Sequence, residues 1–216
     1  MFVLLDDLVK TQKEAPSDTL LSKYLHGQVD DRKLNEAEIT QFFQVLSIAG
    51  HETTRNSTAH FVRLMDEHPD QKALLLEDLE GRLPNAIEEV LRFSPPVMQF
   101  CRTATEDVTI RGVEIAQGDK VYLSYLSANR DEDVFDDPGR FDILRERADR
   151  HLAFGTGAHF CLGASLARLQ LRCILTELYT RLPDIALAGP PTPMHSVWFN
   201  ALTEMPVATC PVAHSD

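Results

Sequence analysis

The sequence contains no apolar run long enough to cross a membrane. A membrane-spanning helix needs about 18 or more consecutive apolar residues, and the apolar start of the chain, MFVLLDDLVK, is interrupted by Asp6 and Asp7. We therefore expect no membrane span and no signal peptide. The hydrophobic fraction of 44 % is typical of a globular protein.

Positive charge is scarce as well. The 216 residues include 21 Lys and Arg against 33 Asp and Glu, which gives a formal net charge of −12. A protein that binds nucleic acid needs a basic surface to meet the phosphates. The charge balance therefore argues against a nucleic-acid partner.

Cysteines are few, and their spacing forms no framework. The four are Cys101, Cys161, Cys173 and Cys210, and none belongs to a CxxC pair. This pattern suits reduced thiols in a cytoplasmic protein rather than a disulfide scaffold. The missing CxxC pair also argues against a structural zinc site.

What the chain does have is a glycine-rich stretch around one cysteine, FGTGAHFCLG at residues 154–163. Gly155, Gly157 and Gly163 allow positive φ and a close approach of the backbone to a flat ligand. A nucleotide-binding loop is one interpretation, but Phe160 stands where G-x-G-x-x-G requires its last glycine. The loop therefore indicates a ligand site of another kind.

A long amphipathic helix is predicted to begin at or just after Cys161. The apolar residues that recur at helical spacing are Leu162, Leu166, Leu169, Ile174 and Leu178. At a helix N-terminus the dipole and the unpaired N–H groups stabilise a thiolate, and a thiolate is a good ligand for iron. From the residues alone, a small core cysteine remains the other interpretation of Cys161.

A polar cluster, AGHETT at residues 49–54, interrupts an apolar helix. Asn35 as N-cap and Glu38 as its capping-box partner predict the start of that helix, and Glu67 lies near its end. Its middle is apolar on nearly every side, so we expect it to be buried. An HExxH zinc site is excluded by Arg55. The cluster is either a set of threonines bonded back to helix carbonyls or a functional site.

The other predicted elements are shorter. They are one or two helices in residues 3–25, a helix at 70–80 stopped by GRLPN, a helix at 86–93, strands in 97–124, an irregular segment at 131–153 and strands after Pro183.

The cysteine loop resembles the haem-binding signature of the cytochromes P450, F-G-x-G-x-H-x-C-x-G, at every specified position. The resemblance implies that Cys161 is the axial thiolate on the iron of haem b, in a loop where Gly155 approaches the cofactor. It implies that Phe154 packs beside the sulfur and that His159 bonds a haem propionate. A thiolate ligand pushes electron density onto the iron and favours O–O cleavage.

AGHETT resembles the oxygen-activation segment of the same family, A-G-x-[DE]-T-[ST], again at every specified position. By this resemblance Glu52 and Thr53 are the acid–alcohol pair that delivers protons during oxygen activation, which is general acid work. Ala49 and Gly50 are the small residues that leave room over the haem for O2, the co-substrate, and for the substrate.

Two further features follow the family pattern. Glu89 and Arg92 share a helix face at i, i+3 spacing and resemble the E-x-x-R motif, whose pair joins a downstream arginine that would here be Arg140. This triad is structural, because it braces the cysteine loop. Arg102 matches the position whose guanidinium binds a haem propionate.

The substrate-lining residues implied by the resemblance lie in two apolar segments. Val97, Met98 and Phe100 follow a Pro-Pro pair that precedes the haem pocket in the family, and Trp198 and Phe199 match a C-terminal loop that enters it. Strands that simply pack in the core are the alternative for both segments.

The resemblance covers the chain from about residue 3 to its end, but only the C-terminal half of the family. Residues 1–216 are therefore expected to be the C-terminal haem-binding part of a cytochrome P450 domain, with the N-terminal half absent. The implied fold is mainly α with small β-sheets (α+β). It has a long central helix, the cysteine loop and the helix that follows it.

The implied function is that of a cytoplasmic haem-thiolate monooxygenase, which inserts one oxygen atom of O2 into an apolar small-molecule substrate. Its electrons would come from a ferredoxin-like carrier and its reductase. Arginines around the cysteine would suit an acidic carrier, or are simply solvated. They are Arg145, Arg147, Arg150, Arg168 and Arg172. The alternative function is a truncated, non-catalytic haem-binding or interaction fragment.

Overall fold

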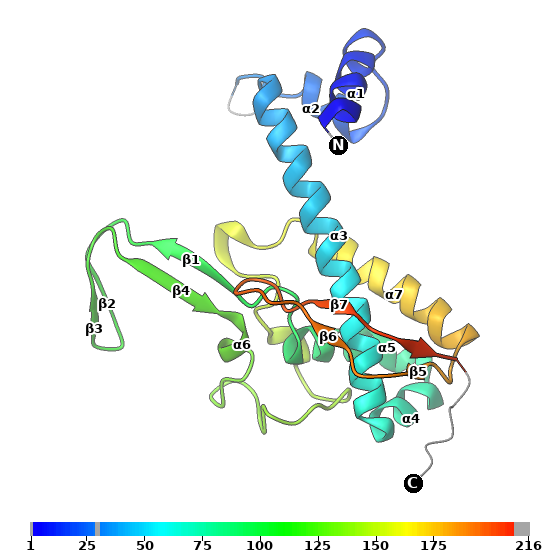
Figure 1. Ribbon diagram of the computed structural model, residues 1–216. Coiled ribbons are helices and arrows are strands. Elements are labelled where there is room, and N and C mark those ends of the chain that lie inside the picture. Colours follow the sequence, from blue (N-terminus) through cyan, green and yellow to red (C-terminus); the bar gives the residue numbers. More distant parts are fainter. Residues whose placement is uncertain (1, 29–30, 210–216) are drawn as a thin grey trace. The chain divides into compact units, whose positions relative to one another are not determined.

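The structure is a computed structural model that describes residues 2–28 and 31–209, with side chains described from residue 7 onward. The chain divides into two compact units, Met1–His51 and Glu52–Asp216. Helices make up most of the regular structure, and the strands form two-stranded sheets (Figure 1). The predicted mainly α fold with small β-sheets is confirmed. Cys210 lies outside the described residues.

The first unit holds two short helices and the start of a long one. These are α1 (Phe2–Glu14), α2 (Leu20–His26) and α3 (Glu36–Glu67). Its small apolar core consists of Val9, Leu21, Leu25 and Ile39. The expectation of short helices at the start of the chain is confirmed, and Thr19 caps α2 by accepting a hydrogen bond from the N–H of Ser22.

The start of α3 is fixed by the capping box that the sequence predicts. The N–H of Glu38 donates to Asn35 Oδ1 at 3.0 Å, and the N–H of Asn35 donates to Glu38 Oε2 at 2.9 Å. These two bonds satisfy donors that a helix N-terminus otherwise leaves without a partner. The helix ends at Glu67, just before Pro69, as predicted.

The prediction that the middle of α3 is buried is wrong for the described chain. Val45 is 62 % exposed and Ile48 is 53 % exposed, and Ala49 and Gly50 are exposed as well. The apolar pattern of a helix shows which of its positions favour burial, but it does not show what covers them.

The segment GRLPN lies inside a helix, so the prediction that it ends one is wrong. Helix α4 (Pro69–Glu77) ends earlier, and α5 (Leu79–Phe93) begins after Asp78, whose carboxylate accepts the N–H of Gly81 at 3.0 Å. Pro84 has no N–H to bond the carbonyl oxygen of Glu80, so it costs α5 one backbone hydrogen bond. Helix α5 also has a strongly apolar face with Leu83, Ile87 and Leu91 buried, and packing of that face outweighs the turn signal.

The strands predicted in residues 97–124 form two hairpin-like pairs. Strand β1 (Gln99–Thr103) pairs antiparallel with β4 (Lys120–Ser124), and β2 (Val108–Ile110) pairs with β3 (Val113–Ile115). Gly112 and Gly118 sit in the connecting turns with φ of 81° and 94°, a conformation that favours glycine. A short helix, α6 (Tyr125–Ala128), follows β4 directly.

The helix predicted after the cysteine is α7 (Ala164–Arg181), but the predicted apolar face is the exposed one. The residues that α7 buries are Ala164, Leu171, Leu175 and Tyr179. Exposed instead are Leu162, Leu166, Leu169 and Ile174. Two apolar stripes share this helix, and spacing alone does not reveal which of them meets the core.

The core of the second unit is built from the end of α3 with α4, α5 and α7. Phe61 of α3 packs with ring centroids 5.7 Å from Tyr179 of α7, and Leu75 of α4 and Leu91 of α5 lie in the same cluster. Burying a large apolar side chain stabilises a fold by about 1.5–3 kcal/mol. This core therefore holds α5 and α7, the two helices that flank the cysteine loop.

The C-terminal strands are short, as the sequence predicts. Strand β5 (Ala186–Leu187) pairs with β8 (Val207–Ala208), and β6 (Thr192–Pro193) pairs with β7 (Leu202–Glu204). No described helix has the length and apolar character needed to cross a membrane.

Candidate functional site

The cysteine loop is closed by a backbone hydrogen bond across it. The N–H of Cys161 donates to the carbonyl oxygen of Phe154 at 2.9 Å. Between them, Gly155 and Gly157 have φ of 71° and 70°, and a short 3-10 helix spans Gly157–His159. The thiol of Cys161 is exposed and forms no disulfide.

Gly155 is required by the space around it as well as by its backbone angle. A Cβ built on this glycine would lie 3.1 Å from the Tyr125 hydroxyl oxygen and 3.6 Å from the carbonyl oxygen of His159. The loop is therefore drawn tightly against α6, and any side chain at this position would push the two apart.

The loop leads directly into α7. Gly163 stands at the N-cap of that helix, and the carbonyl oxygen of Cys161 accepts the N–H of Ala164 at 3.2 Å. The positive end of the helix dipole therefore lies beside the cysteine, where it favours an anion. This is the geometry expected of a thiolate ligand.

The ring of Phe154 is packed from three sides. The guanidinium carbon of Arg168 lies 4.5 Å from its centroid, and the centroids of His151 and Phe160 lie at 5.7 and 6.3 Å. A cation over an aromatic face adds roughly 0.5–2 kcal/mol. The ring is therefore fixed at the start of the loop.

A cluster of charged residues that the sequence did not reveal lies beside this ring. Glu88 of α5 accepts from Arg168 Nε at 2.6 Å and Nη2 at 2.8 Å, and its Oε2 lies 3.1 Å from His151 Nε2. Burial opposes ionisation of Glu88, but the hydrogen bonds from Arg168 and His151 outweigh it and lower its pKa from 4.5 to about 2. The only signal in the sequence was Glu88 itself, an acidic residue next to Glu89 in the predicted helix at 86–93.

Glu89 and Arg92 form the buried pair that their spacing allows. Arg92 Nε and Nη2 donate to the two carboxylate oxygens of Glu89 at 2.7 and 2.8 Å, and both side chains are 0 % exposed. Arg92 also donates to the carbonyl oxygens of Asn129, Pro138 and Arg140. The pair thereby connects α5 to the irregular segment before the cysteine loop.

The arginine that joins this pair is Arg145, so the prediction of Arg140 is wrong. Arg145 Nε lies 3.2 Å from both carboxylate oxygens of Glu89, and its side chain is 8 % exposed. The side chain of Arg140 is 62 % exposed and lies 3.6 Å from Asp142. Arg140 contributes its carbonyl oxygen instead, because the irregular backbone turns its side chain outward.

A cavity of about 590 Å³ lies beside the cysteine loop. Arg102, Tyr125, Leu152 and Thr156 are among its lining residues. Arg102 is partly exposed, with its guanidinium carbon 5.9 Å from the ring centroid of Phe100. The cavity thus joins the strand that carries Arg102 to the loop that carries Cys161, while His159 is exposed on that loop.

The two predicted substrate segments lie side by side. Val97 pairs with Phe199 in an isolated bridge, and the N–H of Met98 donates to the carbonyl oxygen of Trp198 at 2.8 Å. The rings of Phe100 and Trp198 pack edge to face at 5.9 Å. Both of these side chains remain partly exposed, Phe100 by 39 % and Trp198 by 52 %.

Glu52 and Thr53 lie on α3 at the start of the second unit. Glu52 is ion-paired with Arg55 at 2.7 Å, and its backbone carbonyl accepts from the Asn56 side chain at 2.8 Å. The next residue, Thr54, lies 3.5 Å from Gln170 Oε1 on α7. This part of α3 therefore contacts the same helix that begins after Cys161, through the long Thr54–Gln170 contact.

Two of the five arginines considered for partner docking are engaged inside the protein. Arg145 bonds Glu89 and Arg168 bonds Glu88. Arg147, Arg150 and Arg172 are exposed. Only these three of the five arginines therefore remain available for the partner docking that the sequence suggested.

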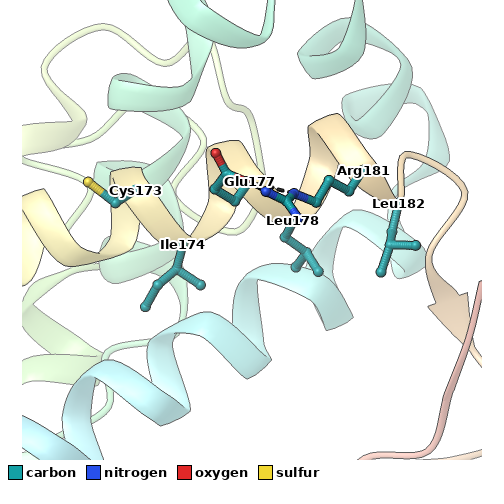
Figure 2. A pocket seen from close by; sticks show the side chains of 6 residues that line it. All are labelled: Cys173, Ile174, Glu177, Leu178, Arg181 and Leu182. Carbon is teal, nitrogen blue, oxygen red and sulfur yellow. Dashed lines mark hydrogen bonds and ion pairs between the residues drawn. The ribbon is translucent and has the colours of Figure 1, made fainter.

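A second hollow, of about 550 Å³, runs along α7. Figure 2 shows Ile174, Leu178 and Leu182 extending from one side of the helix, while Glu177 and Arg181 pair with each other at 2.7 Å. The hollow lies toward the end of α7 away from Cys161. Its lining is mostly apolar, so the groups suited to chemistry lie in the cysteine loop.

The haem implied by the sequence fits the residues present. The exposed Cys161 thiol is flanked by Phe160 and Leu162, which are 53 % and 78 % exposed. A flat, apolar macrocycle suits such a surface, and Arg102 and His159 suit its carboxylates. No described group of three or more His, Cys, Asp or Glu side chains could hold a bare metal ion, whereas a haem iron needs one protein ligand on this side.

Comparisons with known proteins agree with this fit. A sequence model of the Cytochrome P450 family matches residues 4–182. The methyl-branched lipid omega-hydroxylase of Mycobacterium tuberculosis (strain H37Rv) is 42 % identical over 191 residues, which is 88 % of this chain and 44 % of that protein. The steroid C26-monooxygenase of Rhodococcus jostii is 40 % identical over 210 residues, 94 % of this chain and 44 % of that protein. The chain spans about half the length of these curated relatives.

Solved structures show the same fold. A cytochrome P450 of Mycobacterium marinum in complex with pseudoionone has a TM-score of 0.89 at 40 % identity, and the match covers 94 % of this chain and 49 % of that one. A Bacillus megaterium relative in complex with testosterone has a TM-score of 0.89 at 33 % identity, covering 96 % of this chain and 57 % of that one.

Proposed function

Because the chain belongs to the cytochrome P450 family, we propose that residues 1–216 are the C-terminal haem-binding part of a monooxygenase and that Cys161 is the iron ligand. One observation carries the proposal. The Cys161 thiol is exposed and unbonded on a loop of positive-φ glycines, directly before the N-terminus of α7. A thiolate there is stabilised by the helix and accessible to a flat cofactor.

Haem b, when bound, supplies the iron at which O2 is activated. Around it the chain would provide orientation and charge. Cys161 ligates the iron, and the backbone at Gly155 allows close approach. Phe154 packs beside the sulfur, while His159 and Arg102 donate hydrogen bonds to the two propionates.

Glu52 and Thr53 are the proposed proton-delivery pair, with Ala49 and Gly50 leaving room for O2 beside them. In this proposal the Thr53 hydroxyl donates a proton toward the reacting oxygen. The Glu52 carboxylate binds the group that supplies this proton. The ion pair between Glu52 and Arg55 keeps the carboxylate on the helix surface. A positioned acid of this kind contributes about 10²–10⁴-fold to rate.

The substrate class is proposed to be an apolar small molecule of the lipid or steroid kind. Val97, Met98, Phe100, Trp198 and Phe199 would line its site. Support comes from the pairing of the two segments and from the exposed rings of Phe100 and Trp198. The two relatives are named for action on methyl-branched lipids and on steroids, which supports the same substrate class.

The electron donor is proposed to be an acidic carrier of the ferredoxin kind, supplied by its own reductase. Arg147, Arg150 and Arg172 are exposed near the cysteine loop in sequence, and complementary charge speeds the encounter of such partners. We propose a cytoplasmic location, in keeping with the unbonded Cys101, Cys161 and Cys173.

The second candidate function is haem binding without turnover by this chain alone. It is favoured by the exposure of Phe160 and Leu162 beside the thiol. Oxygen activation needs a site that excludes water, whereas these apolar side chains are exposed to solvent.

Haem titration of the 216-residue chain, followed by an oxygenation assay, tests both candidates. The leading proposal expects uptake of one haem per chain, with a Cys101→Ala variant as a control that binds equally well. Turnover by the loaded chain would overturn the second candidate. Failure of the chain to bind haem at any concentration would contradict the first.

A further inference from the structure

The side chain of Arg168 links α7 to the cysteine loop. Its guanidinium carbon lies 4.5 Å from the ring centroid of Phe154, and the carbonyl oxygen of Phe154 accepts the N–H of Cys161 at 2.9 Å. Two contacts therefore join Arg168 to the backbone of Cys161, although seven positions separate them in sequence.

Glu88 fixes the orientation of this guanidinium. It accepts two parallel hydrogen bonds, from Nε at 2.6 Å and from Nη2 at 2.8 Å. A bidentate bond of this kind holds the planar group in one orientation. The Glu88 side chain is 11 % exposed and the Arg168 side chain 37 % exposed, so solvent reaches the pair mainly from the arginine side.

His151 completes the support from the other side. Its Nε2 lies 3.1 Å from Glu88 Oε2, and its Nδ1 accepts the N–H of Ala153 at 3.1 Å. Ala153 immediately precedes Phe154. The three side chains therefore contact the loop at two points: His151 bonds the N–H of Ala153, and Arg168 packs on the ring of Phe154.

We propose that Arg168, held by Glu88, is a positioning residue that fixes Phe154 and thereby the conformation of the Cys161 loop. The Arg168 guanidinium also places a positive charge at the start of the Cys161 loop, where it balances the Glu88 carboxylate. Reduction of the iron adds negative charge to the site, so this cation favours the reduced state. The effect of the charge on reduction rests on the proposed role of Cys161 as ligand. The positioning of the loop by Arg168 applies with or without haem.

Hydrogen exchange of the Cys161 amide in the haem-free, full 216-residue chain tests the positioning role. Arg168→Gln is expected to speed that exchange by about tenfold or more, since loosening Phe154 frees the acceptor. Arg172→Gln, one turn further along α7 and exposed, is the matched control and should leave the exchange unchanged.

A double-mutant cycle separates this role from general destabilisation. In a Phe154→Leu background the ring is gone, so Arg168→Gln should add little to the exchange rate. Equal effects of Arg168→Gln in both backgrounds, or no effect in either, would overturn the proposal. If Arg168→Gln does not fold, Arg168→Lys serves, because it keeps the charge but loses the bidentate bond.

The midpoint potential of the haem-loaded chain provides a second readout. Arg168→Gln is expected to lower it, Arg168→Lys to leave it nearly unchanged, and Arg172→Gln to leave it unchanged. An unaltered potential in Arg168→Gln would refute the charge effect. If the wild-type chain binds no haem, the proposed function fails, while the exchange measurement still decides the positioning role.

Discussion

Phe154 and Cys161 are bonded through their backbones, with the N–H of the cysteine donating to the phenylalanine carbonyl oxygen at 2.9 Å. Two positive-φ glycines lie between them, so the loop turns back on itself and presents the thiol outward. The position of the sulfur is thus determined by the ring and backbone of a residue seven positions earlier. Contacts to Phe154 can therefore affect Cys161 without touching it.

Replacing Arg145 is expected to destabilise the protein far more than replacing Arg140. Arg145→Gln leaves the fully buried carboxylate of Glu89 with one cation fewer, which costs about 2–4 kcal/mol. Arg140→Gln, the control, changes an exposed side chain and should cost less than about 0.5 kcal/mol. Chemical unfolding of the two variants checks this order, and equal losses would contradict the assignment of Arg145.

Tyr179→Phe is expected to leave the protein as stable or make it more stable, by up to about 1 kcal/mol. The Tyr179 hydroxyl is buried and has no hydrogen-bond partner among the described residues, and burial raises its pKa. Removing an unsatisfied polar atom removes its desolvation cost. Thermal unfolding measures the difference, with the exposed Tyr122→Phe as a neutral control. A loss of stability would show that the hydroxyl has a partner.

Stability should fall as the pH drops below about 4.5, and Glu88 should account for part of that fall. The pKa of Glu88 is lowered to about 2 in the folded protein, so the unfolded chain takes up its proton first. The stabilisation is complete above 4.5 and is lost as the pH approaches 2. Glu88→Gln should therefore show a shallower pH dependence of unfolding over this range. Identical slopes for variant and wild type would contradict the lowered pKa.

Thr53→Ala is expected to uncouple oxygen consumption from product formation in a haem-loaded protein that turns over. Without the hydroxyl, proton delivery fails and reduced oxygen leaves as hydrogen peroxide, so the peroxide-to-product ratio should rise by about tenfold or more. Thr58→Ala is the control, because its hydroxyl is bonded to the Thr54 carbonyl oxygen one turn away. Unchanged coupling in Thr53→Ala would refute the proton-delivery role.

Local signals predicted a large part of the fold. The capping pair Asn35 and Glu38 located the start of α3, and the pattern of residues 97–124 located the strands β1 to β4. These features depend on residues close together in the chain, so the sequence carries them directly. The cysteine loop was predictable for the same reason, since its glycines and its following helix are adjacent.

Long-range choices could not be predicted in this way. Arg140 and Arg145 both lie in the same irregular segment, and only the folded backbone decides which side chain reaches Glu89. Similarly, α7 carries two apolar stripes, and the one that packs, with Leu171 and Leu175, is selected by the surfaces of α3 and α5. The support of Phe154 by Glu88 and Arg168 was missed because it joins separate helices.

The absorption spectrum of the haem-loaded chain, reduced under carbon monoxide, shows directly whether Cys161 is the iron ligand. We expect the Soret band of a thiolate-ligated haem for wild type and for Cys173→Ala, whose thiol is also exposed, and the loss of that band in Cys161→Ala. Persistence of the thiolate band in Cys161→Ala would contradict the assignment.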